Sequence, residues 1–296
     1  MINRVDIEQG IKIAAQVLHE PIEGELQFVK QMGIKYVILR AGGNENSYQC
    51  YANRRSLVEE AGLKLYGILN RGVHNQDSIV LNLAKRGNKI EEYKAHLRNL
   101  AQAGIPYTTY AHMANGIWRT KPELTRGSAM SKAFNLEKAQ EGHWDTVSYQ
   151  MPLSHGRRYS VEEIWENFTY FIKEIAPVAE EVGVKIGIHP DDPPQPELAG
   201  VPRIFSDFEG FKRALEIADS PNVGICLCVG CWLEGGNLMG KGILETIHYF
   251  GEQNKIFKVH LRNVFVFLIA LDRNEVLVDV DSLLIIIFVY KFNKNC

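Results

Sequence analysis

The chain has 296 residues, of which 46% are hydrophobic and 23% charged, and its formal net charge is -2. This composition is typical of a globular protein and excludes a disordered tail, a collagen-like repeat and a small disulfide-stapled scaffold. The near-neutral charge, without a clustered basic segment, argues against a nucleic-acid partner. A chain of this length has enough residues for one large core, and α/β barrels of similar length form single domains.

The cysteines and the apolar runs indicate where the protein is located. The five cysteines are Cys50, Cys226, Cys228, Cys231 and Cys296, an odd number with three crowded together. This pattern does not fit a secreted disulfide framework and favours a reducing compartment. The N-terminus lacks the apolar segment of a signal peptide, and the longest apolar run, residues 283–290, is far shorter than the roughly 20 residues that span a bilayer. We therefore expect a cytoplasmic protein with no membrane segment.

Four segments share a pattern in which a helical stretch ends in glycine and an apolar, often β-branched run follows at once. They are residues 33–40, 62–70, 104–112 and 183–189. Glycine just past a helix adopts the left-handed conformation at low cost, and a buried parallel strand appears as a nearly continuous apolar run. Each segment therefore predicts a junction between a helix and a strand.

Seven strands are predicted in all, with helices in most of the connections between them. In chain order the strands are residues 11–17, 33–40, 62–70, 104–112, 183–189, 222–229 and 255–262. The helices with the clearest 3.6-residue period are residues 90–103, 161–181, 208–218 and 241–253. Strand and helix in alternation indicate a parallel α/β sheet, and we predict a (β/α)8 TIM barrel that is incomplete at the eighth βα unit.

The predicted barrel domain covers residues 1–264, and two regions interrupt its regular pattern. A long insertion, residues 113–159, follows the fourth strand, on the face where barrels carry their active sites. Residues 265–296 form an atypical C-terminal tail with no glycine, no proline and no clear helical period. Within it, residues 283–290 could supply an eighth strand or could be unrelated sequence appended to a shortened barrel; the sequence leaves both open.

Side chains suited to a metal occur where three adjacent predicted strands end. The fifth strand ends at His189, the sixth carries Cys226 and Cys228, and the seventh carries His260 and Arg262. Because side chains alternate along a strand, each of these sets faces one way, toward the barrel interior. Two imidazoles and a thiolate would suit a divalent transition metal, and Cys228 lies nearer the strand end than Cys226. The alternative is that these are ordinary buried core residues.

Polar residues at other strand ends could face the same opening. They are Arg40, Asn70, Arg71 and His112. The planar fork of arginine suits carboxylate recognition, although such residues are equally often solvent-exposed loop charges.

The insertion places Asn115 and Trp118 beside Arg119. An aromatic ring next to polar groups suits a sugar-like ligand, while Trp118 could equally pack the insertion onto the barrel.

An ordered series of motifs resembles the mannonate dehydratase family over roughly residues 30–264. The motifs include His189-Pro-Asp-Asp-Pro-Pro, the segment 208–222, Cys226-Leu-Cys-Val-Gly and His260-Leu-Arg-Asn-Val. The resemblance implies a xylose-isomerase-like TIM barrel with a divalent metal, usually Mn²⁺ with Fe²⁺ as the alternative. It also implies dehydration of D-mannonate to 2-keto-3-deoxy-D-gluconate in hexuronate catabolism, by a carbon–oxygen lyase.

Carried over by motif, the resemblance assigns the metal to His189, Cys228 and His260. For the small sugar-acid substrate we predict contacts from Arg40, His112, Asn115, Trp118, Asp192 and Arg262. The family continues to a final strand with an Asp-His-Gly-Arg motif that supplies a fourth ligand and a catalytic histidine. No Asp-His pair occurs after residue 264 in this sequence, so the general acid and base stay unassigned and turnover by this chain is left open.

Two alternatives stay open beside the dehydratase, and a third is disfavoured. One is a sugar isomerase or epimerase of the same barrel superfamily, and another is a barrel that binds its ligand without turnover. A phosphodiesterase of the endonuclease-IV type would need more His, Asp and Glu ligands and a basic surface, neither of which is evident. Self-association into a homo-oligomer is compatible with the sequence.

Overall fold

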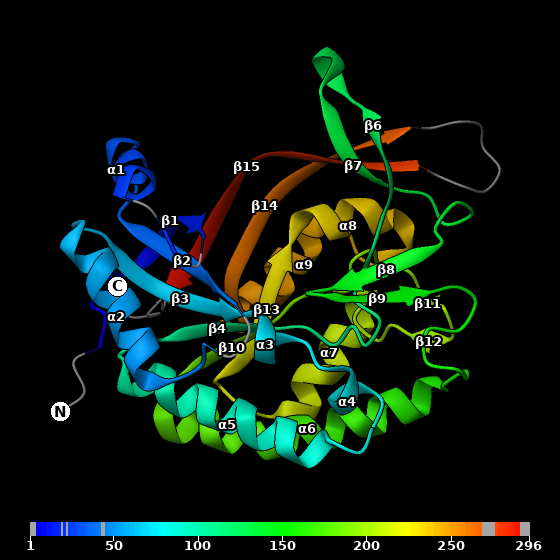
Figure 1. The fold of residues 1–296 in the computed structure, drawn as a ribbon, viewed down its shortest axis with the longest axis horizontal. Coiled ribbons are helices and arrows are strands. Elements are labelled where there is room, and N and C mark those ends of the chain that lie inside the picture. The colour runs from blue at the N-terminus through cyan, green and yellow to red at the C-terminus, as the bar shows by residue number, and fades with distance from the viewer. Residues whose placement is uncertain (1–3, 19, 22, 43–44, 268–275, 291–296) are drawn as a thin grey trace.

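The computed structural model describes residues 4–18, 20–21, 23–42, 45–267 and 276–290, and its centre is a curled sheet of parallel strands (Figure 1). The neighbouring parallel strands are, in order, β1 (Gly10–Val17), β2 (Tyr36–Ala41), β3 (Lys64–Asn70), β4 (Tyr107–Tyr110), β10 (Lys185–Ile188), β13 (Val223–Cys228) and β14 (Ile256–Phe267). The seven predicted strands are thereby confirmed. Their order in the sheet is their order in the chain, as in a TIM barrel.

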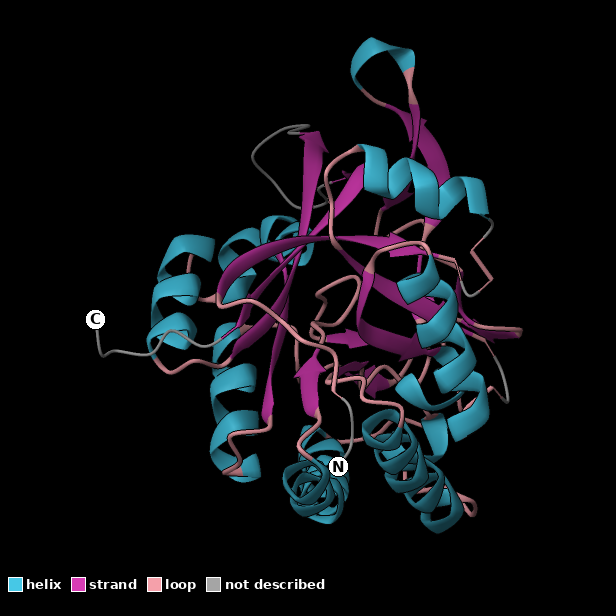
Figure 2. Ribbon diagram, turned by 90° about the vertical axis from the view of Figure 1, so that its left-hand side faces the viewer, coloured by secondary structure: helices cyan, strands magenta, loops and turns pink. Residues whose placement is uncertain are grey.

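Helices cover the outside of this sheet, as Figure 2 shows. The longer ones are α1 (Glu23–Gln31), α2 (Tyr48–Glu60), α5 (Arg86–Gln102), α6 (Val161–Val182), α7 (Phe208–Ala218) and α9 (Ile243–Glu252). The shorter ones are α3 (Arg71–His74), α4 (Asp77–Val80), α8 (Val229–Gly235) and the 3-10 turns η1 (Arg126–Ser128) and η2 (Gly236–Met239). The four helices predicted from their period correspond to α5, α6, α7 and α9.

The ends of α6 illustrate how local sequence sets an element. Ser160 accepts a hydrogen bond from the backbone N–H of Glu163, whose side chain accepts from the backbone N–H of Ser160, forming a capping box. At the other end Gly183 has φ 67° and ψ 31°, the left-handed conformation that favours glycine. The strand β10 then begins two residues later, as the glycine pattern predicts.

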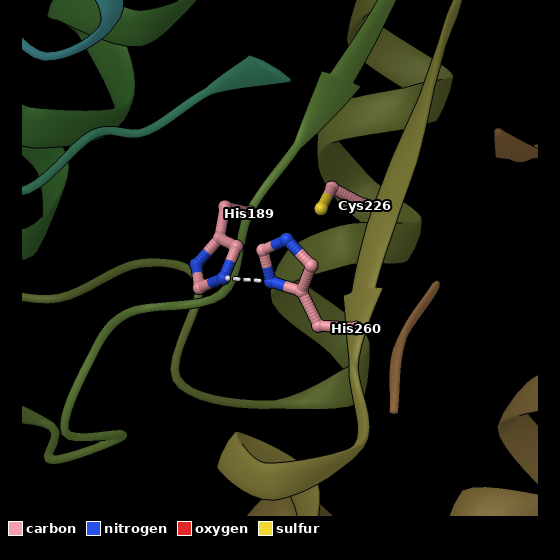
Figure 3. A group of neighbouring side chains, drawn as sticks. All are labelled: His189, Cys226 and His260. Atoms are coloured by element: carbon pink, nitrogen blue, oxygen red, sulfur yellow. Dashed lines mark hydrogen bonds between the residues drawn. The ribbon is translucent and has the colours of Figure 1, made fainter. Parts of the chain in front are cut away.

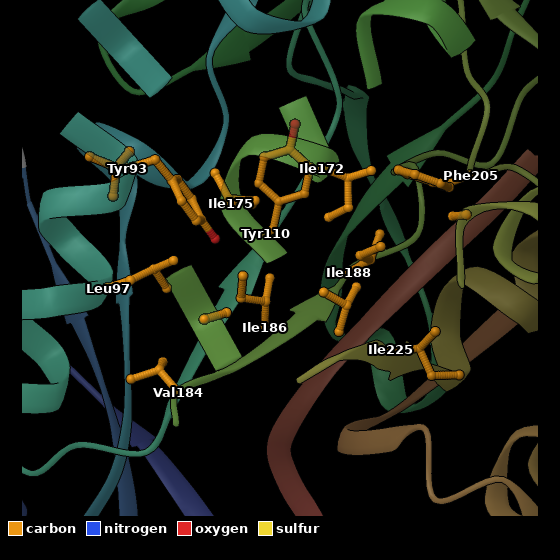
Figure 4. Packing of buried hydrophobic residues seen from close by; sticks show 14 of the residues in the cluster. Tyr93, Leu97, Tyr110, Ile172, Ile175, Val184, Ile186, Ile188, Phe205 and Ile225 are labelled. Carbon is orange, nitrogen blue, oxygen red and sulfur yellow. The ribbon is translucent and has the colours of Figure 1, made fainter. Parts of the chain in front are cut away.

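The main core lies between the barrel strands and the surrounding helices (Figure 4). Tyr110 of β4 stacks on Phe171 of α6 with ring centroids 4.6 Å apart, and Tyr93 of α5 meets the edge of both rings. Ile186 and Ile188 of β10 are fully buried in the same layer. This packing fixes the strands relative to the helices around them, and the carboxyl ends of the strands lie together at one rim of the barrel.

The eighth position of the barrel is occupied by an antiparallel strand, β15 (Val276–Tyr290). It pairs with β14 on one side, where Ile287 faces Val259, and with β1 on the other, where Ile285 faces Ala15. Residues 283–290 therefore do form an eighth strand. A parallel strand would need a crossover connection after β14, whereas β15 returns directly alongside it. The barrel is thus incomplete as a (β/α)8 barrel, as predicted, because its eighth unit is not parallel.

The insertion after β4 folds into small antiparallel sheets above the rim. One is a separate sheet of β5 (Ile117–Trp118), β8 (Glu141–Trp144) and β9 (Val147–Gln150). The other is the hairpin of β6 (Thr120–Leu124) and β7 (Met130–Phe134), which continues the barrel sheet beyond β15. The backbone of β7 pairs antiparallel with β15, with residues 132 and 279 opposite each other in the ladder, which joins the insertion to the last strand (Figure 1). A further pair, β11 (Glu197–Leu198) and β12 (Val201–Pro202), follows β10.

The division of the chain at residue 264 stays a prediction, and β14 runs through that position as one strand. In the part of the chain that the structure describes, no helix is both long and apolar enough to cross a membrane.

Candidate active site

A cavity of about 230 Å³ opens at the carboxyl ends of the barrel strands, the edge where barrel enzymes bind their substrates. It is lined by Gln16, Arg40, Leu69, Arg71, His74, Met113, Ile117, Arg119, Lys132, Trp144, His189, Asp192, Cys228, His260 and Arg262. The lining includes the three predicted metal ligands and three of the predicted substrate-binding residues. The fold thus brings together residues that are more than 200 positions apart in the chain.

The two predicted imidazole ligands face each other across the cavity floor. His189 Nδ1 donates to the carbonyl of Pro190 at 2.7 Å, which leaves a lone pair on its Nε2. That Nε2 lies 3.2 Å from Nδ1 of His260, so His260 donates and keeps its own Nε2 lone pair. Among the described residues, this buried Nε2 has no hydrogen-bond partner. Burial lowers the pKa of His260 to about 3, with help from Lys258, so the imidazole is neutral, as a metal ligand must be.

Two cysteines of β13 supply sulfur near this pair. One ligand atom from each of His189, Cys226 and His260 lies within 4.8 Å of the others (Figure 3). Cys228, two residues further along the same face, lines the cavity and contacts both imidazoles. A hydrogen bond from Cys231 lowers the pKa of Cys228 well below its ordinary value, whereas burial raises that of Cys226. Cys228 lines the cavity, but the sulfur in the cluster with the two imidazoles is that of Cys226, which the sequence argument set aside. The choice of Cys228 as the ligand therefore stays a prediction.

Two guanidinium groups and two carboxylates form the wall beside the imidazoles. Arg119 donates two hydrogen bonds to Asp192, at 2.7 and 2.9 Å, and Arg262 Nη1 lies 3.7 Å from the same carboxylate. Burial by itself would raise the pKa of Asp192, but these two cations lower it below its ordinary value. Arg262 also donates to Glu234 at 2.8 Å. Burial raises the pKa of Glu234 to about 8, so this carboxyl group is largely protonated at neutral pH and the group keeps a net positive charge. Such an edge is of the kind that recognises a carboxylate.

Gly230 allows Arg262 to reach this position. A Cβ atom built at Gly230 would lie 2.0 Å from Nε of Arg262, far inside contact distance. We expect Gly230→Ala to displace the Arg262 guanidinium and to lower the free energy of unfolding by about 1–3 kcal/mol, as overpacking does. Urea unfolding measures this change.

Gly87→Ala in α5 is the matched control for that substitution, because nothing lies within 4 Å of the added Cβ. It should leave stability unchanged or raise it by up to about 1 kcal/mol. Equal losses in the two variants would contradict the role of Gly230.

His112, a predicted substrate-binding residue, lies outside the cavity lining. Its Nδ1 is hydrogen bonded to Tyr110 Oη at 2.6 Å, and the rings of Phe168 and Phe205 pack against it at right angles or nearly so. The side chain therefore belongs to the aromatic layer between β4 and α6. The chain leaves β4 at Tyr110, so His112 no longer follows the inward alternation that the strand-end argument assumed.

Asn115 and Trp118 are also buried away from the cavity, where they hold the insertion together. Asn115 Nδ2 donates to the carbonyl of Leu198 at 2.7 Å, and its Oδ1 accepts from Arg203 at 2.9 Å. Trp118 Nε1 donates to the carbonyl of Asn115 at 3.0 Å, and its ring packs with Phe134 in a separate apolar cluster. Of the two interpretations of Trp118, contact with a ligand or packing of the insertion, the structure has the second.

Several cavity residues were missed as candidate site residues. The clearest is His74 of α3, whose Nδ1 donates to the carbonyl of Thr109 at 2.8 Å and whose ring stacks on Trp144 with centroids 5.4 Å apart. Burial and nearby His189 lower its pKa, so it is neutral. The sequence offered one signal for His74. It follows Arg71, a candidate at the end of β3, by three residues, so on a helix the two side chains would lie on the same face. Trp144, Lys132 and Gln16 gave no comparable signal, because only the folded insertion and the strand β1 bring them to the rim.

Comparisons with known proteins point to one family. The model of the family "UxuA: D-mannonate dehydratase" matches residues 22–270. A mannonate dehydratase from Thermotoga neapolitana is 35% identical over 234 residues, which are 71% of this chain and 63% of the relative. The chain thus spans less than two thirds of that relative's length.

Solved structures show the same relationship. A mannonate dehydratase from Streptococcus suis superposes with a TM-score of 0.75 at 26% identity, covering 92% of this chain and 76% of the other. A xylose isomerase domain protein from Planctomyces limnophilus has a TM-score of 0.52 at 10% identity, over 87% and 76% of the two chains, which shows the shared fold alone. The xylose-isomerase-like barrel is thereby confirmed. With the family model matching most of its length, the chain belongs to the mannonate dehydratase family.

Proposed function

We propose that this chain is a metal-dependent hydro-lyase that converts D-mannonate to 2-keto-3-deoxy-D-gluconate and water. The observation that carries the proposal is the single cavity in which His189, Cys228 and His260 meet the guanidinium groups of Arg119 and Arg262. The proposal includes Mn²⁺ as the metal, with Fe²⁺ as the alternative, and a cytoplasmic role in hexuronate catabolism. Assembly into a homo-oligomer stays a prediction.

The donor set fits a transition metal. His260 Nε2 is buried without a hydrogen-bond partner among the described residues, and a neutral imidazole keeps a lone pair there. His189 Nε2 lies 3.2 Å from Nδ1 of the same ring and Cys228 lines the same cavity, so we assign the metal to these three side chains. Two nitrogens and a sulfur suit a divalent transition ion. When bound, the metal supplies positive charge beside the carbon that loses its proton.

The other wall residues would divide the remaining tasks. Arg262 and Arg119, fixed by Asp192, bind and orient the carboxylate of the sugar acid. Loss of the adjacent proton leaves enediolate-like charge, which the same guanidinium groups stabilise. His74 is neutral and donates through Nδ1 to Thr109, so its Nε2 has the lone pair to accept a proton at the cavity wall. We therefore propose His74 for the base, in place of the family's C-terminal histidine. The carbon–oxygen bond of the neighbouring hydroxyl group then breaks, and the proton held on His74 passes to that oxygen, which leaves as water.

The test is incubation of the full chain with Mn²⁺ and D-mannonate, with the 2-keto-3-deoxy product followed by NMR. We expect product above a metal-free control, and His74→Gln should lower the rate by about 10²–10⁴-fold while Mn²⁺ still binds. An epimer formed without loss of water would favour the isomerase or epimerase alternative. Absence of any product from a chain that binds Mn²⁺ would favour a barrel without turnover.

A further inference from the structure

The charges on the described lining of the cavity are strongly unbalanced. Five of the lining side chains are cationic and one is a carboxylate. The cations are Arg40, Arg71, Arg119, Lys132 and Arg262, and the carboxylate is that of Asp192. The proposed reaction gives tasks to Arg119 and Arg262 alone. A sugar acid with one carboxylate leaves the other cations without an anion to bind.

Four of these cations form two pairs on opposite sides of the barrel rim. Around the barrel the strands follow in the order β1, β2, β3, β4, β10, β13, β14 and β15, and β15 pairs with β1. In a ring of eight, β13 is the fourth strand on from β2 and β14 the fourth from β3, so these strands face each other across the opening. The first arginine pair, Arg119 and Arg262, lies on the β14 side, where both contact Asp192.

The second arginine pair, Arg40 and Arg71, lies on the facing side. Arg40 belongs to β2, and Arg71 directly follows the last residue of β3. Both side chains line the cavity. A ligand that extends across the opening from the first arginine pair therefore reaches the second.

Neutral groups orient the second arginine pair. With its amide turned to accept, the Gln16 side-chain oxygen lies 2.6 Å from Nε and 2.5 Å from Nη2 of Arg40. Arg71 Cζ lies 6.0 Å from the centroid of the Trp144 ring, and among the residues that the structure describes Arg71 forms no ion pair. An amide and an aromatic ring orient a guanidinium group without cancelling its charge. The second pair is thus placed to bind an anion.

We propose that the preferred substrate is a six-carbon sugar acid with a second anionic group at C6, a carboxylate or a phosphate, which Arg40 and Arg71 bind. The planar fork of arginine binds either group through two parallel hydrogen bonds. The inference rests on the proposed function, because the first arginine pair still binds the C1 carboxylate and the acid still loses one molecule of water. C6 takes no part in that reaction. D-Mannonate has a hydroxyl group at C6, which offers the second pair a hydrogen bond but no charge.

The first test measures binding to the full chain by isothermal titration calorimetry, with and without Mn²⁺. The probes are D-mannonate, D-mannarate with a carboxylate at C6, and 6-phospho-D-mannonate. We expect at least one of the two dianionic acids to bind about 10–100-fold more tightly than D-mannonate, because hydrogen bonds between charged groups are strong. The tighter of the two identifies the group at C6. Equal affinities for all three acids would overturn the proposal.

The second test uses the ratio of the affinities for the dianionic acid and for D-mannonate. Arg71→Gln should lower this ratio by about tenfold, and Arg71→Lys, which keeps the charge, should restore part of it. A purely structural change would weaken the binding of both acids alike and leave the ratio as it is. Arg98→Gln is the matched control, since Arg98 is exposed on α5 outside the cavity lining. A ratio that is the same in Arg71→Gln and Arg98→Gln would refute the role of the second arginine pair.

Turnover separates this proposal from the proposed function. Loss of water from the dianionic acid, with kcat/KM at least tenfold above that for D-mannonate, would support both. Dehydration of D-mannonate together with equal affinities for the three acids would overturn the second anion and leave the proposed function standing. A dianionic acid that binds in an Arg71-dependent way but loses no water would support the ligand class and overturn the hydro-lyase.

Discussion

Replacement of His260 by alanine is expected to abolish Mn²⁺ binding. His260 contributes a neutral imidazole whose Nε2 is buried without a hydrogen-bond partner among the described residues, and it also donates to His189. The substitution thus removes one ligand and the group that orients a second. Loss of a residue that only hydrogen bonds to a metal ligand typically lowers metal affinity by about 10–100-fold, so loss of a ligand itself should lower it further. Elemental analysis of the loaded and desalted protein measures the result.

His248→Ala is the matched control, since His248 is exposed on α9 away from the cavity, and its Mn²⁺ content should equal that of the parent. The sulfur ligand is tested alongside: Cys228→Ser should lose the metal, and Cys226→Ser should keep it. The opposite outcome would transfer the sulfur ligand to Cys226. Unchanged metal content in His260→Ala, with native circular dichroism, would refute the assignment of the imidazoles.

The free energy of unfolding should fall steeply in mild acid because several histidines are buried in neutral form, and two of them, His96 and His112, lie outside the cavity lining. Burial lowers the pKa of His96 and of His112 to about 3 each. Both values are below the ordinary 6.5, so the unfolded chain takes up protons first as the pH falls. Their contribution is fully present above pH 6.5 and is lost as the pH falls toward 3. The loss approaches about 1.4 kcal/mol per pH unit for each histidine.

Urea unfolding between pH 7 and 4 measures this slope. Carboxyl groups also contribute to the pH dependence of the free energy of unfolding. The decisive quantity is therefore the difference in slope between the parent and a histidine variant. His112→Gln should flatten the slope by up to about 1.4 kcal/mol per unit below pH 5.5, whatever its effect on stability at pH 7. His248→Gln, at an exposed position, should leave the slope as it is. Equal slopes in the parent and His112→Gln would show that this imidazole is protonated in the folded protein.

The elements with local signals were predictable from the sequence. Gly183 ends α6 in a left-handed conformation, and the buried run of β10 follows, so both boundaries are visible in a few neighbouring residues. The strand-end rule also located His189 and His260, because alternation along a strand decides which side chains face inward. Each of these inferences depends on a short stretch of chain. The predicted direction of a side chain is correct as long as its residue still lies within the strand.

The same rule did not place His112, because β4 ends two residues earlier and the chain turns there. Asn115 and Trp118 belong to the insertion, whose polar groups are satisfied by Leu198 and by each other. His74 reaches the cavity from the helix after β3. In each case a contact between distant segments determines the position, and no local pattern encodes it.

The sequence by itself determined the parallel strand and helix order and the family, since these depend on local periodicity or on ordered motifs, and the metal ligands that it indicates stay a prediction. Only the tertiary structure decided that the last strand, β15, closes the barrel antiparallel between β14 and β1. It also decided that Arg119, Asp192 and Arg262 form one network. The physical reason is that these strand and charge pairs join residues far apart in the chain, such as β1 with β15 and Arg119 with Asp192, and the partners meet only once the chain has folded.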